Sequence, residues 1–311
     1  MASDIVADLH NHSTASDGDL APAELVRRAA RSGLRALALT DHDCLDGLSE
    51  ALSEGEKLGI RVIPGTEVSV RFRRAAFTGS LHFLLYFSPK QLEQDDFRRA
   101  LEDLLEGGRG PELVRARVSA INREFGPRGR NPLLSRPLEV EEITFYSNNA
   151  TRRHFALALS EKHGLKDKET VNRIIANDSP AYLPSGVELE RLAAFRAAHP
   201  CLCVLAHPAA GSWPGQGHYK EVLPPLEVVR SMLPEFLQTP GLDGIEVRYP
   251  GHTPEHQREL LQWAAAHRLL VTGGSDCHDD SGRPFGVEGM GSVQLLEFLR
   301  RLDALSAPGE D

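Results

Sequence analysis

Cysteine is scarce in this chain of 311 residues, which carries only Cys44, Cys201, Cys203 and Cys277. The four stand singly or as Cys-x-Cys inside apolar stretches. This spacing excludes a dense disulfide framework of the kind found in small secreted domains, and it does not match a zinc ribbon. We therefore expect reduced, buried thiols.

Long apolar runs are also missing. No stretch reaches the roughly 18 consecutive apolar residues that a membrane-spanning helix needs. The first residues, Met-Ala-Ser-Asp-Ile-Val-Ala-Asp, lack the basic segment and the apolar segment of a secretory leader. The sequence predicts a cytoplasmic protein with no membrane partner, and nothing in it indicates an obligate protein partner.

Basic residues are in the minority: 35 Lys and Arg stand against 44 Asp and Glu, so the formal net charge of −9 would repel polyanions at long range. The segment from Gly107 to Arg153 is an exception, with nine Arg and no Lys against five Glu and no Asp. This local excess fits a solvated helical surface or a surface that binds anions. Charge alone leaves both readings open.

Short apolar runs alternate with segments of helical periodicity near both ends of the chain. The expected strands cover 5–9, 36–40, 61–63, 201–206, 244–247 and 269–272, and the expected helices cover 22–32, 47–58, 225–237, 254–267 and 293–302. This alternation is typical of an α/β protein with a parallel sheet or barrel.

The middle of the chain differs from the two ends. Between about Pro89 and Leu192 the strand signals fade and the pattern is mostly helical, interrupted by the Gly-Pro-Arg-Gly-Arg-Asn-Pro stretch that begins at Gly126. We predict a barrel built from residues 1–88 and 193–311, with residues 89–192 forming a helical insertion domain that covers the substrate.

Potential metal ligands follow nearly every expected strand. The set consists of His10, His12, Asp17, His42, Glu67, His82, His207, Asp276 and His278. A single His-x-His pair would be weak evidence, because two histidines this close are often accidental. Parallel barrels place their active sites at the carboxyl ends of the strands, so a ligand at one strand end after another indicates a shared site.

The chemistry of this set narrows the choice of metal. Imidazole and carboxylate ligands without cysteine favour Zn, Mn or Fe over copper or calcium. The ligands exceed what one ion can use, so we expect two or three divalent ions, with Glu67 placed to bridge two of them. Paired metals activate water at neutral pH and clamp a phosphoryl group. By contrast, His163, His199 and His267 have no neighbouring ligands in the sequence and are expected to be structural.

Several motifs resemble those of the polymerase and histidinol phosphatase (PHP) family. They are Asp8-Leu9-His10-Asn11-His12-Ser13, Ser16-Asp17-Gly18, Leu39-Thr40-Asp41-His42-Asp43, Gly65-Thr66-Glu67, Ala206-His207-Pro208 and Gly274-Ser275-Asp276-Cys277-His278. The resemblance implies a distorted seven-stranded α/β barrel with a trinuclear cluster. It assigns His10, His12, Glu67 and Asp276 to the first ion, Glu67, His82 and His207 to the second, and Asp17, His42 and His278 to the third.

The insertion resembles one subgroup of this family. Thr151-Arg152-Arg153-His154-Phe155-Ala156 and Pro180-Ala181-Tyr182-Leu183 are similar to segments of PHP enzymes that dephosphorylate nucleoside 3′,5′-bisphosphates or trim short RNA from its 5′ end. The resemblance implies that Arg152 and His154 bind substrate phosphate. The subgroup often has a lysine where this chain has Ser179, so one phosphate contact differs.

These features predict a metal-dependent phosphoesterase in which a metal-bridging hydroxide attacks phosphorus. Glu67, Asp276 and His154 are the expected catalytic residues. The acid that protonates the leaving oxygen is His154 or a metal-bound water. Asp41 and Asp43 are expected to orient the ligand imidazoles.

Three alternatives stay open at this stage. A histidinol phosphate phosphatase would share the cluster without needing the Thr-Arg-Arg-His segment. An amidohydrolase would be expected to use a carboxylated lysine as its bridge, where this chain offers Glu67. A module that binds metal without catalysis is the alternative from a different class.

Overall fold

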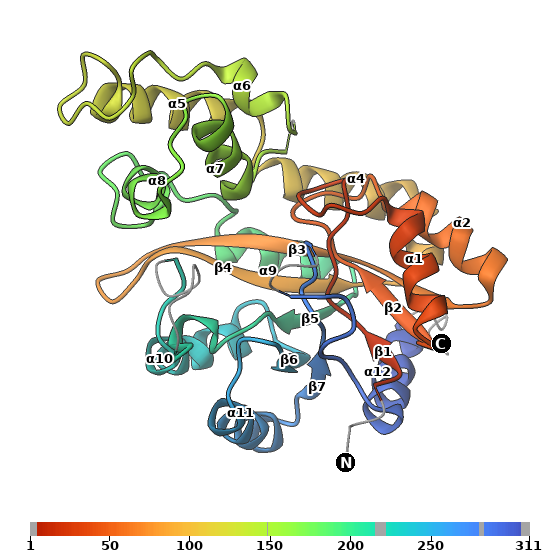
Figure 1. Ribbon diagram of the computed structural model, residues 1–311. Helices are drawn as coiled ribbons and strands as arrows, with labels where there is room; N and C mark the ends of the chain where they lie inside the picture. The colour runs from red at the N-terminus through yellow and green to blue at the C-terminus, as the bar shows by residue number, and fades with distance from the viewer. Residues whose placement is uncertain (1–4, 148, 215–221, 280–282, 306–311) are drawn as a thin grey trace.

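The computed structural model describes residues 5–147, 149–214, 222–279 and 283–305, and its centre is a nearly closed barrel of seven strands (Figure 1). The strands neighbour one another in chain order: β1 (Ala7–Asp8), β2 (Ala36–Leu39), β3 (Arg61–Arg73), β4 (Thr78–Tyr86), β5 (Leu202–Leu205), β6 (Gly244–Arg248) and β7 (Leu270–Gly273). Beyond the two edge strands, a bridge pairs Asn11 with Cys277 and draws the edges together. The α/β barrel expected from the sequence is confirmed.

One strand departs from the parallel arrangement that the alternating pattern predicted. β4 is antiparallel to both of its neighbours, β3 and β5. Only Arg74–Phe77 connect β3 to β4, and so short a connection cannot carry the crossover that parallel neighbours require. The two strands therefore form a long hairpin in which Ser69 lies opposite His82.

Proline and glycine mark helix ends in the barrel, as the sequence pattern indicated. They are α1 (Pro22–Arg31), α2 (Leu48–Leu58), α10 (Leu226–Gln238), α11 (Pro254–His267) and α12 (Ser292–Ala304), with a short 3-10 turn, η1 (Ala210–Ser212). Pro22 begins α1, where its missing N–H costs no hydrogen bond. Gly59 ends α2 in the left-handed conformation, which glycine adopts without a steric penalty.

The predicted insertion contains two kinds of helix. It includes α3 (Pro89–Leu92), α4 (Asp95–Glu106), α5 (Pro111–Phe125), α6 (Val140–Thr144), α7 (Arg152–Glu161), α8 (Lys168–Ile175) and α9 (Leu189–Ala198). Phe97 of α4 and Leu192 of α9 belong to the barrel core. Phe125, Ile143 and Phe155 belong to a separate apolar core.

We call the lobe of α5 to α8 the cap; Figure 1 shows it standing apart from the barrel, with α4 and α9 nearer the strands. Its core lies between Val114 and Ala181, inside the predicted insertion. The exact boundaries of 89 and 192 stay a prediction.

The remaining expectations from composition concern the cysteines and membrane-spanning helices. All four cysteines are free, and three of them are buried, with Cys44 only partly covered. Among the described helices, none combines the length and the apolarity that crossing a membrane requires.

Candidate metal centre

Glu67 lies at the middle of the predicted ligand set. Its Oε1 is 2.9 Å from Nδ1 of His82 and 3.0 Å from Nε2 of His207. Its Oε2 is 3.1 Å from Nε2 of His12 and 3.0 Å from Nδ1 of His42. Nε2 of His10 is 3.3 Å from the same oxygen. One carboxylate therefore faces five imidazoles, with its two oxygens turned to different groups.

The remaining predicted ligands extend the cluster. Oδ1 of Asp276 lies 3.1 Å from Nε2 of His12, and Oδ1 of Asp17 lies 3.2 Å from Nε2 of His278. Three groups have ligand atoms within 4.8 Å of one another: His10, His12, Glu67 and Asp276; His42, Glu67 and His82; and His12, Asp17, His42 and His278. His12, His42 and Glu67 each belong to two groups, so neighbouring positions share ligands.

Some of the predicted ligands lie just after a strand, and others lie within one. His207 and Asp276 stand just after β5 and β7 with positive φ angles of 31° and 51°, so tight turns at the strand ends aim them inward. Glu67 was expected beyond its strand, and this was wrong, because β3 continues through it to Arg73. His82 is also inside a strand, β4, and reaches the cluster because the hairpin folds β4 back along β3.

The buried polar atoms of this cluster fit metal ions. Nε2 of His10 and of His12, Nδ1 of His42, Oδ1 of Asp17 and Oε2 of Glu67 are buried and make no hydrogen bond with the described residues. Leaving such atoms unsatisfied costs about 1 to 3 kcal/mol each. Their convergence is explained if they share cations, since lone pairs from imidazole and carboxylate are the donors that divalent ions take.

The pKa shifts of Glu67 and His12 favour the protonation states in which these side chains donate lone pairs. Burial disfavours the charged form of Glu67, yet its electrostatic attraction to the surrounding imidazoles, His82 and His42 foremost, outweighs burial and holds the pKa of Glu67 well below its usual value. Burial and the neighbouring His278 lower the pKa of His12 to about 4. At neutral pH the carboxylate is therefore ionised and this imidazole neutral, which is the state that binds metal.

Sequence reasoning missed a carboxylate behind the cluster. Glu246, on β6, is 1% exposed, and its Oε1 lies 3.1 Å from Nδ1 of His10. Its Oε2 accepts a hydrogen bond of 2.8 Å from the backbone N–H of His207. The signal in the sequence was a lone charged residue inside the apolar strand Gly244–Val247. Burying it there requires partners such as these.

The roles predicted for Asp41 and Asp43 were wrong, because neither contacts a ligand imidazole. Asp41 accepts hydrogen bonds from the hydroxyls of Ser13 and Ser16, which tie the His12–Asp17 loop to the second strand end. Asp43 accepts from the backbone N–H and hydroxyl of Ser69, both at 2.7 Å. It also pairs with Arg109, which sequence reasoning did not select.

A cavity of about 580 Å³ separates the cluster from the cap. Glu67, His82 and Asp276 line it from the barrel, and Arg152, Tyr182 and other cap residues line it from the opposite side. This volume lies within the range of small-molecule sites. Nδ2 of Asn149 donates to the backbone oxygen of His42 at 2.5 Å. This hydrogen bond fixes the segment just before α7 beside the cluster.

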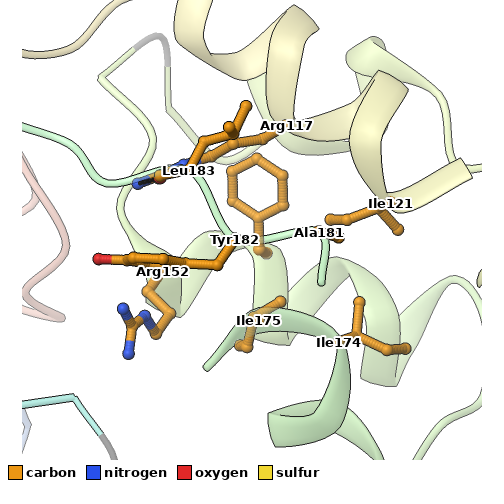
Figure 2. A pocket seen from close by; sticks show the side chains of 9 residues that line it. Arg117, Ile121, Arg152, Ile174, Ile175, Ala181, Tyr182 and Leu183 are labelled. Carbon is orange, nitrogen blue, oxygen red and sulfur yellow. Dashed lines mark hydrogen bonds between the residues drawn. The ribbon is translucent and has the colours of Figure 1, made fainter. Parts of the chain in front are cut away.

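The two predicted substrate-binding residues have different surroundings. Arg152 lines the cavity, donates 2.7 Å to Oδ1 of Asn177 and lies over the ring of Tyr182 (Figure 2). His154 is 5% exposed and is not among the residues that line the cavity. Its Nδ1 accepts the backbone N–H of Thr151 at 3.0 Å and so completes a capping box.

The other two positions of interest in the insertion have structural partners. Arg153 pairs with Asp19 at 2.8 Å and Asp279 at 2.7 Å, two carboxylates from barrel loops. Ser179 is buried, and its hydroxyl donates to the backbone oxygen of Ile174 at 2.8 Å. This serine therefore serves a local turn and does not line the cavity.

The PHP domain model matches residues 8–205, which is more than half of the chain and includes the predicted ligands from His10 to His82. The chain belongs to the PHP domain family. It is therefore a metal-dependent phosphoesterase by family, and its barrel of seven strands agrees with that family's fold.

Relatives of known name cover nearly the whole chain. A 3′,5′-nucleoside bisphosphate phosphatase from Chromobacterium violaceum is 31% identical over 90% of this PHP protein and 90% of its own length. A 5′-3′ exoribonuclease from Haemophilus influenzae is 28% identical, with 88% and 90% covered. A phosphoribosyl 1,2-cyclic phosphate 1,2-diphosphodiesterase from Eggerthella lenta is 30% identical, with 90% and 96% covered.

Two solved structures share the fold. A Bifidobacterium adolescentis protein described as a metal-dependent phosphoesterase superposes with a TM-score of 0.70 at 25% identity, with 95% of this chain and 96% of that chain covered. A Chromobacterium violaceum amidohydrolase, solved with bound sulfate and no metal, gives a TM-score of 0.70 at 26% identity, with 98% and 100% covered. Both matches therefore span the residues of the barrel and of the cap.

Proposed function

We propose that this PHP phosphoesterase removes the 3′-phosphate of nucleoside 3′,5′-bisphosphates or cleaves short 5′-phosphorylated RNA. The observation that carries the proposal is the cavity shared by the metal-ligand cluster and the arginine-bearing cap. A phosphate ester on the cluster side would leave the rest of a nucleotide facing the cap. The names of the Chromobacterium violaceum and Haemophilus influenzae relatives support the same substrate class.

Two or three Mn, Fe or Zn ions would be held by the three ligand groups. His10, His12, Glu67 and Asp276 suit one ion, and Asp17, His42 and His278, together with His12, suit another. Glu67 and His82 suit a further ion, with His42 in the same group and with His207 facing the same oxygen of Glu67 as His82 does. Such ions supply an activated water and neutralise negative charge on the phosphoryl oxygens.

The protein side chains contribute binding and positioning in this scheme. Glu67 and Asp276 hold the ligand groups together at the floor of the cavity. The planar guanidinium of Arg152 can hold a phosphate oxygen pair by two parallel hydrogen bonds. Its contact with Asn177 fixes the guanidinium while leaving it on the cavity wall.

We further propose that His154 donates a hydrogen bond from Nε2 to the leaving oxygen and so stabilises its negative charge, while a water held by the ions would supply the proton. Its Nδ1 accepts a backbone N–H, so the proton of the neutral ring is carried by Nε2. Burial lowers the pKa of His154, while the nearby carboxylate of Asp17 raises it in part.

A side-by-side assay of the metal-loaded protein tests this function. The substrates are adenosine 3′,5′-bisphosphate, a short 5′-phosphorylated RNA, histidinol phosphate and phosphoribosyl 1,2-cyclic phosphate. The highest kcat/KM is expected for the bisphosphate or the RNA. A preference for histidinol phosphate or for the cyclic phosphate would overturn the nucleotide assignment. Absence of turnover on all four, with the metals bound, would favour the module without catalysis.

A further inference from the structure

Arg109 lies in the connection that leads from the barrel into the cap. The stretch Gly107-Gly108-Arg109-Gly110 joins α4, which packs on the barrel core, to α5, the first helix of the cap (Figure 1). The side chain of Arg109 is 7% exposed and pairs with Asp43, whose side chain is 1% exposed. Nη2 of Arg109 also donates to the hydroxyl of Ser69 at 2.9 Å. A side chain at the base of the cap therefore reaches back into the barrel.

Asp43 in turn holds the turn that carries a predicted metal ligand. It directly follows His42 and has a positive φ of 45°. Its backbone N–H donates to the backbone oxygen of Glu67 at 3.1 Å, and its carboxylate accepts from Ser69, further along β3. A bridge pairs His42 with Glu67. The carboxylate thus acts on His42 through the backbone, without touching the imidazole.

Ser69 is the residue of β3 at which both connections of the cap arrive. On the first connection Arg109 donates to its hydroxyl, and on the second Val187 donates its backbone N–H to the backbone oxygen of Ser69 at 2.9 Å. The two connections also contact each other, since the N–H of Gly186 donates to the oxygen of Gly108 at 2.7 Å. The base of the cap is therefore fixed to the strand that carries the central carboxylate of the cluster.

We propose that Arg109 is a positioning residue for the metal centre and acts through Asp43. The inference rests on the metal centre given above, and the ligands affected are His42 and Glu67. Removing the guanidinium would leave the buried carboxylate of Asp43 without its ion-pair partner, which is a costly state. The turn would shift to let water reach the carboxylate, and both ligands would lose the geometry that this turn imposes.

Titration of the metal-depleted protein with Mn measures the effect. Arg109→Met keeps much of the apolar stem and removes the charge. Asp43→Asn removes the charge at the other end of the pair, while asparagine still tolerates the positive φ. Each variant should bind Mn about tenfold to 100-fold more weakly, as for other outer partners of metal ligands. Arg109→Lys can make only one of the two contacts and should lose less than Arg109→Met.

The double variant shows whether Arg109 acts through Asp43. If the two residues work as one pair, breaking it twice adds nothing, so the double variant should stay within about twofold of the weaker single variant. Losses that multiply in the double variant would overturn the proposed route.

Arg115→Met is the matched control, because Arg115 lies on α5, is exposed and pairs with Glu112. It should leave Mn affinity unchanged. If Arg109→Met fails to fold, Arg109→Lys and Asp43→Asn decide the question. Unchanged Mn affinity in folded variants would overturn the positioning role, and a raised KM for adenosine 3′,5′-bisphosphate alongside it would make Arg109 a substrate contact instead. If the wild type binds no Mn, the metal centre and the positioning role both fail.

Discussion

Nδ1 of His10 lies 3.1 Å from Oε1 of Glu246, although 236 positions separate the two residues in the chain. The contact leaves Nε2 of His10 turned toward Glu67 and Asp276. A carboxylate behind a ligand histidine sets its tautomer and its ring orientation and raises its basicity as a ligand. Glu246 also accepts the N–H of His207, so one buried group positions two of the predicted ligands.

Replacing Glu246 with Gln should weaken metal binding. An amide keeps the shape but offers only one oxygen, so it cannot accept from both His10 and the backbone of His207. Metal affinity should fall by about tenfold to 100-fold, as for other outer partners of metal ligands. Titration of the metal-depleted protein with Mn measures this. Glu227→Gln, at an exposed glutamate, is the control, and equal affinities in the two variants would refute the positioning role.

Replacing Arg152 with Lys should impair catalysis without changing metal content. Lysine keeps the charge but loses the planar pair of donors. The kcat/KM for adenosine 3′,5′-bisphosphate should fall by about tenfold to 150-fold, and Arg152→Ala should be at least as damaging. Arg128→Lys, on the exposed surface of the cap, should be silent. If both Arg152 variants stay close to the wild type with metals bound, the nucleotide assignment loses its main support.

Loss of Glu67 should be more damaging than loss of one histidine. Glu67→Gln disturbs contacts with five imidazoles, while His278→Ala removes a ligand from one group. We expect Glu67→Gln to reduce activity by more than the roughly tenfold to 100-fold typical of changes behind the ligands. Kinetics and bound metal are measured on both variants in parallel. Similar losses would argue against a bridging role.

The cap should lose stability at low pH through Glu142. Hydrogen bonding to Arg136 lowers the pKa of Glu142 to about 2, and His163 adds to the shift. Because the folded pKa is below the unfolded value of about 4.3, its stabilising effect is present above that value and declines as the pH falls toward about 2. Glu142→Gln should cost about 1 to 2 kcal/mol at pH 7 and less near pH 3.

Chemical denaturation at several pH values checks this dependence, with the exposed neighbour Glu141→Gln as the control. A difference between Glu142→Gln and the wild type that does not change with pH would show that the carboxylate charge does not stabilise the cap.

Local sequence patterns were enough to predict the limits of several helices and the positions of most ligands. Helix α11 begins and ends where periodicity placed it, because Pro254 and the last apolar turn mark its limits. Most of the predicted ligands come together because the barrel gathers its strand ends at one side, while Glu67 and His82 lie within β3 and β4. The helix limits and the place of each strand end could be predicted because they depend on residues that are close in the chain.

Long-range features were not predictable in the same way. The antiparallel course of β4 depends on strand pairing, and an apolar strand looks alike in either direction. Glu246 and Arg109 stand in no recognisable motif, and their partners are fixed only when distant elements pack. Asp41 and Asp43 were misassigned because flanking a ligand in sequence does not determine which way a carboxylate turns.

Metal stoichiometry tests the proposed multinuclear centre most directly. The protein is stripped with chelator, reconstituted separately with Mn, Fe and Zn, freed of unbound ion and analysed for metal per chain. Shared ligands around Glu67 predict more than one tightly bound equivalent for at least one of these metals, with hydrolysis of adenosine 3′,5′-bisphosphate rising as the second equivalent binds. No more than one equivalent with every metal would contradict the multinuclear centre.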